Sequence, residues 1–357
     1  TATLSNAHTL AELKAINNKL SGTLTLNDYT VALSGSAADI AAALAGAFAS
    51  TYTGNVTITD ADAADINATD INAIATATNG TVTISNNVDI NGTATAVSTA
   101  VGNVNTFSKA AVTATLSTNH SLAELKAINN AVGGQLTLNS YAVALSGSTA
   151  DVKAALDGSF ASAYSGNVTI SDANTTNITA TDITQIEGDT TGTITVTNNI
   201  DINGTAAEVA AAVDDVNTFS GIPTATLSNA HTLAELKAIN NKLSGTLTLN
   251  DYTVALSGSS ADVAAALDGT FASTYTGTAT VNNAHTLAQL KTINNGTTGQ
   301  ITLTDYTVAL SGSTADVKAA LDGSFASAYT GNVTLSDANT VDINGTDITQ
   351  IEGDTTG

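Results

Sequence analysis

Short runs of alternating apolar and polar residues, each followed by a helical pattern, recur along the whole chain. In the stretch 23–54 the first run places Leu24 and Leu26 on one face, and after a turn a second run covers Tyr29–Leu33, with Tyr29, Val31 and Leu33 on one face. Alternation with a period of two is typical of half-buried strands. Two short strands are therefore predicted in this stretch.

A helix is predicted directly after the second strand. Ser36 with Asp39 three positions later resembles a capping box, in which the serine side chain accepts a hydrogen bond from the first helical turn. The apolar stripe of this predicted helix is formed by Ile40, Leu44 and Phe48. The unit is thus strand, corner, strand and helix.

Close copies of this unit return at 135–166, 246–277 and 300–331. Alignment of the first strands gives one apolar register residue in each of thirteen coils: Leu4, Leu26, Ile58, Ile84, Leu116, Leu138, Ile170, Val196, Leu227, Leu249, Val281, Leu303 and Leu335. The spacings run 22, 32, 26, 32, then 22, 32, 26, 31, then 22, 32, 22, 32. Four coil types therefore alternate in a super-repeat of 111 to 112 residues, and the third super-repeat is cut short.

The fold class predicted from this repeat is a β-solenoid with short helices in each coil, that is, an α/β solenoid of parallel stacked strands with thirteen coils. A helix of about three turns is marginal in water by itself, and stacking buries its apolar face. The strand, helix, strand connection is expected to be right-handed. We predict one continuous solenoid over 1–357, with super-repeats 1–112, 113–223, 224–277 (truncated) and 278–357 (incomplete).

Glycine marks most coil boundaries, four residues before the register residue. The positions are Gly22, Gly54, Gly80, Gly134, Gly166, Gly192, Gly245, Gly277, Gly299 and Gly331, and Gly357 has the same phase. Glycine at a junction suits either a backbone with positive φ or the close approach of a neighbouring coil. Val112 and Pro223 occupy the two boundaries that differ.

The other coil types carry their own helix signals. In the 22-residue coil Thr9 and Glu12 form a predicted capping box, repeated at Ser121 with Glu124 and at Thr232 with Glu235, and the predicted stripe is Leu10, Leu13 and Ile16. The 26-residue coil has a strand at 56–58, a second apolar point at Ile66 and a short predicted helix with Ile71 and Ile74. The fourth type has a predicted cap at Thr93.

Composition narrows the function classes. Nine Lys plus Arg against 31 Asp plus Glu give a formal charge of −22, which disfavours nucleic acid as a partner. The absence of cysteine excludes disulfides and thiolate metal sites. No run of about 18 apolar residues occurs, so no membrane span is predicted. Because the first residue is Thr1, we expect a processed chain or a segment of a longer one.

Polar residues stand two positions after each register residue, at the predicted corner. The conservative interpretation is that they form Asx turns with the local backbone. The alternative is calcium binding, because stacking would bring Asp28 near Asp60 and Asp305 near Asp337. The candidate metal ligands are Asp28, Asp60, Asp62, Asp305 and Asp337, with Asp65 and backbone carbonyls completing a site.

No catalytic constellation is found, and the chain is predicted not to be an enzyme. The four histidines, His8, His120, His231 and His285, occupy one position before the helix cap of the 22-residue coil, where a structural role is expected. Tyr29, Tyr141, Tyr252 and Tyr306 also recur at one position and are assigned to core or corner packing.

The segments SGSAADIAAAL, SGSTADVKAAL and NGTAAEVAAAV, beside VTITD and VTISN strands, resemble the Ala/Thr/Asn-rich repeat arrays of giant exported bacterial cell-surface proteins, including those of cyanobacteria. The resemblance covers all 357 residues and carries no functional residue. It implies an extracellular or cell-surface location and a structural or adhesive role.

Two functions from different classes remain. The first is a structural repeat protein that forms a rod or filament at or outside the bacterial cell surface. The second is an adhesin or glycan-binding solenoid module, with surface glycans as partners. A polysaccharide-cleaving enzyme ranks third. Since neither end of the chain shows an atypical capping coil, the coils are expected to continue in a longer polypeptide or by head-to-tail stacking of the chain with itself.

Overall fold

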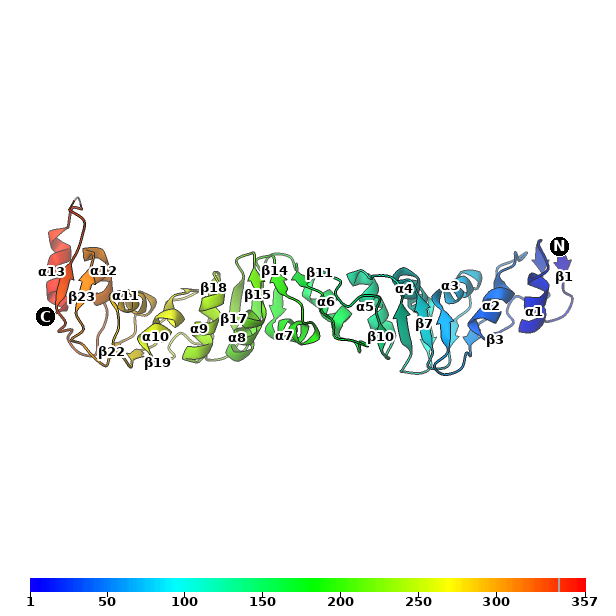
Figure 1. The fold of residues 1–357 in the computed structure, drawn as a ribbon, viewed down its shortest axis with the longest axis horizontal. Helices are drawn as coiled ribbons and strands as arrows, with labels where there is room; N and C mark the ends of the chain where they lie inside the picture. Colours follow the sequence, from blue (N-terminus) through cyan, green and yellow to red (C-terminus); the bar gives the residue numbers. More distant parts are fainter. Residues whose placement is uncertain (340) are drawn as a thin grey trace. The chain divides into compact units, whose positions relative to one another are not determined.

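A computed structural model describes residues 1–339 and 341–357. In the described residues thirteen helices alternate with short parallel strands, as the α/β solenoid prediction requires, and the strands form open, stacked sheets. The contacts divide the chain into two compact units, Thr1–Thr169 with Ile186–Thr193, and Ile170–Gln185 with Ile194–Gly357. The labels in Figure 1 follow the chain through both units.

The elements follow one another in a regular order. Up to β12 they are β1 (Ala2–Thr3), α1 (Leu10–Asn17), β2 (Leu24–Thr25), β3 (Leu33–Gly35), α2 (Ala37–Leu44), β4 (Val56–Ile58), β5 (Asp65–Asn67), α3 (Ala68–Ala77), β6 (Val82–Ile84), β7 (Asp89–Gly92), α4 (Ala94–Asn103), β8 (Thr106–Phe107), β9 (Thr113–Leu116), α5 (Leu122–Ala131), β10 (Leu136–Thr137), β11 (Leu145–Gly147), α6 (Thr149–Leu156) and β12 (Val168–Ile170). From there they are β13 (Asn177–Thr179), α7 (Ala180–Asp189), β14 (Ile194–Val196), β15 (Asp201–Gly204), α8 (Ala206–Asp215), β16 (Thr218–Phe219), β17 (Thr224–Leu227), α9 (Leu233–Lys242), β18 (Thr246–Thr248), β19 (Leu256–Gly258), α10 (Ser260–Leu267), β20 (Thr270–Phe271), β21 (Ala279–Val281), α11 (Leu287–Gly296), β22 (Ile301–Leu303), β23 (Leu310–Gly312), α12 (Thr314–Leu321), β24 (Val333–Leu335) and α13 (Gly345–Asp354).

Each unit contains several parallel sheets rather than one. The first unit has the sheets β1-β2, β3-β4-β6-β8 and β5-β7-β9-β10, and the second has β13-β15-β17-β18-β20, β19-β21-β22 and β23-β24. Successive helices lie side by side, α1 to α6 in the first unit and α8 to α13 in the second (Figure 1). In the part of the chain that the structure describes, no helix is long and apolar enough to cross a membrane.

The pairing of strands corrects the predicted register. Register residues separated by 22 or 26 residues do stack, as Ile58 on Ile84 and Val281 on Leu303 show. Those separated by 31 or 32 residues do not: the partner of Ile58 in the preceding coil is Gly35, and the further pairs are Leu116 with Gly92, Leu227 with Gly204, Val281 with Gly258, and Leu335 with Gly312. The longer units contain a second strand, and the next coil pairs with that strand instead of the first.

Three local predictions in the first unit are wrong in extent. The second strand is Leu33–Gly35 rather than Tyr29–Leu33, because the chain is still turning at Tyr29. Helix α2 ends at Leu44, so Phe48 lies beyond it and forms a parallel bridge with Leu24. Helix α3, predicted to be short, has 10 residues whereas α2 has 8.

The predicted helix starts are confirmed. Thr9 accepts a hydrogen bond from the backbone of Glu12, whose carboxylate accepts one from the backbone N–H of Thr9, and the same reciprocal pair occurs at Ser121 with Glu124 and at Thr232 with Glu235. Ser36 accepts from the backbone of Asp39. In the stripe of α1, Leu13 is fully buried, whereas Leu10 and Ile16 are half-buried.

The junction glycines are explained by close approach and not by φ. No glycine in the described residues has positive φ. A Cβ placed on Gly54 would lie 2.0 Å from the carbonyl oxygen of Val31, and one on Gly80 would lie 2.2 Å from the carbonyl oxygen of Gly54. Both distances are below van der Waals contact, so the neighbouring coil fits only against a residue without a side chain.

The strand phase gives a direct test. Leu26 is 5% exposed and Thr25 is exposed, so the two side chains point to opposite faces. We expect Leu26→Asp to cost about 3 kcal/mol or more, because it buries an unpaired carboxylate and removes apolar packing. Thr25→Asp places the same charge in water and should change stability little. Thermal unfolding followed by circular dichroism compares the two variants. An equal fall in melting temperature would contradict the assignment of Leu26 to the inner face and Thr25 to the outer face.

Candidate functional site

The corner residues are the polar residues that stand two positions after each register residue. Where the register residue lies 31 or 32 positions after the previous one, its corner residue links neighbouring coils. Asp60 Oδ2 accepts a hydrogen bond of 2.8 Å from the backbone N–H of Ala37, the first residue of helix α2 in the preceding coil. The same bond joins Thr118 to Ala94, Asn229 to Ala206, Asn283 to Ser260 and Asp337 to Thr314. Because the first N–H groups of a helix have no partner within it, each of these five residues supplies an acceptor for the helix of the preceding coil.

The other corner residues have different partners. Asp28 Oδ1 accepts from the backbone N–H of Thr30 at 2.8 Å and from its hydroxyl at 2.7 Å, an Asx turn that Asp251 and Asp305 repeat. These bonds lower the pKa of the Asp28 and Asp305 carboxyls below the ordinary value. Asn86 is the corner residue of a coil whose register residue lies 26 positions after the previous one, and its side chain donates to the carbonyl oxygen of Asp60 at 2.7 Å.

The five predicted calcium ligands are thus placed in separate bonding roles. Asp28 and Asp305 accept from their own turns, Asp60 and Asp337 accept from helix starts, and Asp62 Oδ1 accepts from the backbone N–H of Asn87 at 2.9 Å. Within residues 1–339 and 341–357, no group of three or more His, Cys, Asp or Glu side chains is positioned to hold a metal ion. Calcium binding at these carboxylates stays a prediction.

Each histidine of the 22-residue coil contacts a tyrosine 44 residues further along the chain. His8 Nε2 lies 3.2 Å from the Tyr52 hydroxyl, which donates to the carbonyl oxygen of Val31 at 2.5 Å. The same arrangement joins His120 to Tyr164, His231 to Tyr275 and His285 to Tyr329, at 3.1, 3.0 and 3.0 Å. Since the one phenolic hydrogen is used on the carbonyl, the imidazole Nε2–H must be the donor to the tyrosine oxygen.

Burial keeps both groups of this pair neutral. The four histidines are 3 to 5% exposed, and their Nδ1 atoms are buried without a hydrogen-bond partner in the described structure. Burial lowers the pKa of each imidazole, against the smaller opposing effect of carboxylates such as Asp28 and Glu12 beside His8. Burial also raises the pKa of Tyr52 to about 12.

Aromatic packing completes this part of the coil. The ring of Phe48 lies 6.0 Å from that of Tyr52, and Phe160, Phe271 and Phe325 pack in the same way against Tyr164, Tyr275 and Tyr329. The other recurring tyrosines serve the corner: the Tyr29 hydroxyl accepts from the backbone N–H of Leu26 at 3.0 Å. Sequence reasoning placed the histidines at the helix entrance but missed their tyrosine partners, although the constant separation of 44 residues was visible.

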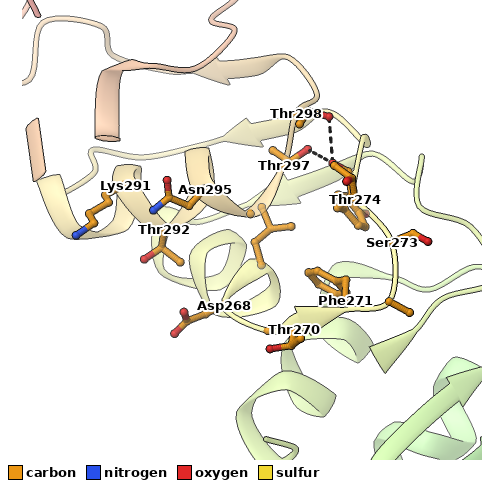
Figure 2. A pocket seen from close by; sticks show the side chains of 15 residues that line it. Asp268, Thr270, Phe271, Ser273, Thr274, Lys291, Thr292, Asn295, Thr297 and Thr298 are labelled. Carbon is orange, nitrogen blue, oxygen red and sulfur yellow. Dashed lines mark hydrogen bonds between the residues drawn. The ribbon is translucent and has the colours of Figure 1, made fainter. Parts of the chain in front are cut away.

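A pocket with a volume of about 840 Å³ lies in the second unit, where the chain leaves α10. Residues 267–275 form one side and α11 with the residues after it forms the other (Figure 2). The lining side chains are mostly polar and include Asp268, Thr270, Ser273, Thr274, Lys291, Thr292 and Asn295. Sequence reasoning did not predict this pocket.

Equivalent hollows in the first unit are smaller. The hollow beside 44–52 has a volume of about 350 Å³, and the hollow beside 156–164 has about 240 Å³. In both cases a 26-residue coil follows, whereas a 22-residue coil follows the pocket of about 840 Å³. The break in the super-repeat therefore coincides with the larger pocket.

Neither the comparison with protein-family models nor the search of curated proteins finds a match for this chain.

The buried histidines predict a pH dependence of stability. Because their pKa values are lowered on folding, the unfolded chain takes up protons before the folded chain does as the pH falls. Stability should be fully present above about pH 6.5 and should decrease below it. Melting temperatures between pH 7.5 and pH 5.5 would show this loss.

The control is a chain with all four histidines replaced by glutamine. The melting temperature of this chain should not show the histidine-dependent decrease below about pH 6.5. Burial raises the pKa values of Asp189 and Asp354, an effect of opposite sign that the control retains. The difference between the two chains therefore isolates the histidines. An identical pH profile for both chains would contradict the prediction.

The capping role of the corner residues predicts a second effect. Asp60→Ala removes the acceptor for the Ala37 N–H of the neighbouring coil and is expected to cost about 1 kcal/mol. Hydrogen exchange should show faster opening at the start of α2 rather than around residue 60. Asp60→Asn, which keeps an acceptor oxygen, is the matched control, and an equal loss in both variants would argue against capping.

Proposed function

We propose that this chain is an extracellular structural repeat protein, one stack of coils that serves as a rod or filament at or outside the bacterial cell surface. The observation that carries the proposal is the capping of five helix starts, those of α2, α4, α8, α10 and α12, by the next coil, as in the bond from Ala37 N–H to Asp60. Bonds of this kind make the stability of a coil depend on its neighbours, which is the property that lets a stack resist local opening.

Ion pairs between adjacent helices support the same role. Lys14 on α1 contacts Asp39 on α2, and the pair recurs as Lys126 with Asp151, Lys237 with Asp262, and Lys291 with Asp316. The side chains involved are about 40% exposed, so water and salt screen the attraction in each pair. The same lateral contact thus recurs between α1 and α2, α5 and α6, α9 and α10, and α11 and α12.

The proposed location outside the cell is supported by composition. The chain has no cysteine, a formal charge of −22 and many small residues. It also resembles the repeat arrays of exported cell-surface proteins. A strongly acidic surface keeps a long assembly soluble through self-repulsion. The proposal implies that the coils continue in a longer polypeptide or that one copy of the chain stacks on another.

Small-angle scattering and cell labelling test the proposal. A single stack should give a radius of gyration well above the value of about 20 Å expected for a compact domain of this length. An antibody against the chain should label intact cells of the source organism. A compact scattering profile, or labelling only after cells are permeabilised, would refute the proposed role.

A further inference from the structure

The pocket beside α10 and α11 carries an inference that goes beyond a structural role. We propose that this pocket binds an uncharged carbohydrate, which contacts Asp268, Thr270, Phe271, Thr292 and Asn295. The volume of about 840 Å³ falls within the range of about 300 to 1,000 Å³ that is typical of small-ligand sites.

The polar side chains match the chemistry of a sugar. Thr270, Ser273 and Thr274 are exposed hydroxyl groups on one side of the pocket, and the amide of Asn295 faces solvent from α11 (Figure 2). Hydroxyl and amide groups both donate and accept hydrogen bonds, as the hydroxyls of a carbohydrate do. A ligand with many hydroxyls satisfies such a lining better than an apolar one.

The charges of the lining select an uncharged ligand. Lys291 Nζ is bonded to Asp316 Oδ1 at 2.5 Å, so its charge is already paired. Asp268 contributes a carboxylate that only accepts hydrogen bonds, which suits sugar hydroxyls and repels a carboxylated or sulfated sugar.

Asp268 differs from its counterpart at the end of α12. There the Asp322 Oδ1 accepts from Gln350 Nε2 on α13 at 2.7 Å. Thr292 occupies the matching position on α11, the sixth residue of each helix, and its side chain is shorter than that of glutamine. In the described residues no hydrogen bond to the Asp268 carboxylate is found, so this acceptor is available to a ligand.

Phe271 supplies the apolar part of the site. Its ring is half-buried and lies 5.7 Å from the buried ring of Tyr275, which holds it in place. Figure 2 shows the Phe271 ring among the polar lining side chains. An aromatic face has a negative potential and attracts the C–H groups on one face of a sugar ring.

The test uses the full chain and a panel of neutral and anionic oligosaccharides. We expect one or more neutral oligosaccharides to bind on an array and in calorimetry. Thr292→Gln, which gives Asp268 the donor that Gln350 gives Asp322, should weaken binding at least tenfold, and Asn295→Ala should do the same. Both variants should keep the melting temperature, because these side chains lie at the surface of α11.

Gln350→Thr is the control. It makes the reverse change on α13, because it removes the donor to Asp322, and it should leave carbohydrate binding at the pocket beside α10 and α11 unaltered. Three outcomes would overturn the proposal: no neutral oligosaccharide binds, Thr292→Gln and Asn295→Ala bind as well as the original chain, or anionic sugars are preferred. None of these outcomes affects the structural role, which scattering and cell labelling test separately.

Discussion

The parallel pairing of strands between successive coils is the constraint on which the rest of this structure depends. Hydrogen-bonded strands lie about 4.8 Å apart, so the backbone of every coil must come that close to the next. At the junctions the approach leaves no room for a side chain, and a Cβ on Gly277 would lie 2.0 Å from the carbonyl oxygen of Val254. The repeated glycines and the small residues around them follow from this spacing.

The same spacing determines how polar groups are satisfied. A helix of eight or ten residues begins with backbone N–H groups that have no partner within the helix. One is capped locally, as by Ser36, and another is capped across the coils, as by Asp60 on Ala37. A coil is therefore complete only when its neighbour is in place, and stability becomes a sum of interactions between nearest neighbours.

Local features of the fold could be predicted from the sequence, whereas the pairing of strands could not. Alternation placed Leu24 and Leu26 inside, and capping boxes located the start of α1 at Thr9, because these signals act within a few residues. The chain contains no local signal that Ile58 pairs with Gly35 instead of Leu26. That choice depends on where the second strand of the longer unit lies in space.

The candidate sites show the same division. Asx turns at Asp28 and Asp305 follow from local backbone geometry and were foreseen as the conservative alternative to calcium. The contact between His8 and Tyr52 joins residues 44 positions apart; the sequence shows this constant separation, but only the stacked coils show that the two side chains meet. In a chain this repetitive, departures from the pattern carry more information about function than the pattern itself. Thr292 stands on α11 where α13 has Gln350, and the strands and the helix of the coil are kept. The Asp268 carboxylate and the pocket beside it stay open, which a scaffold alone does not require.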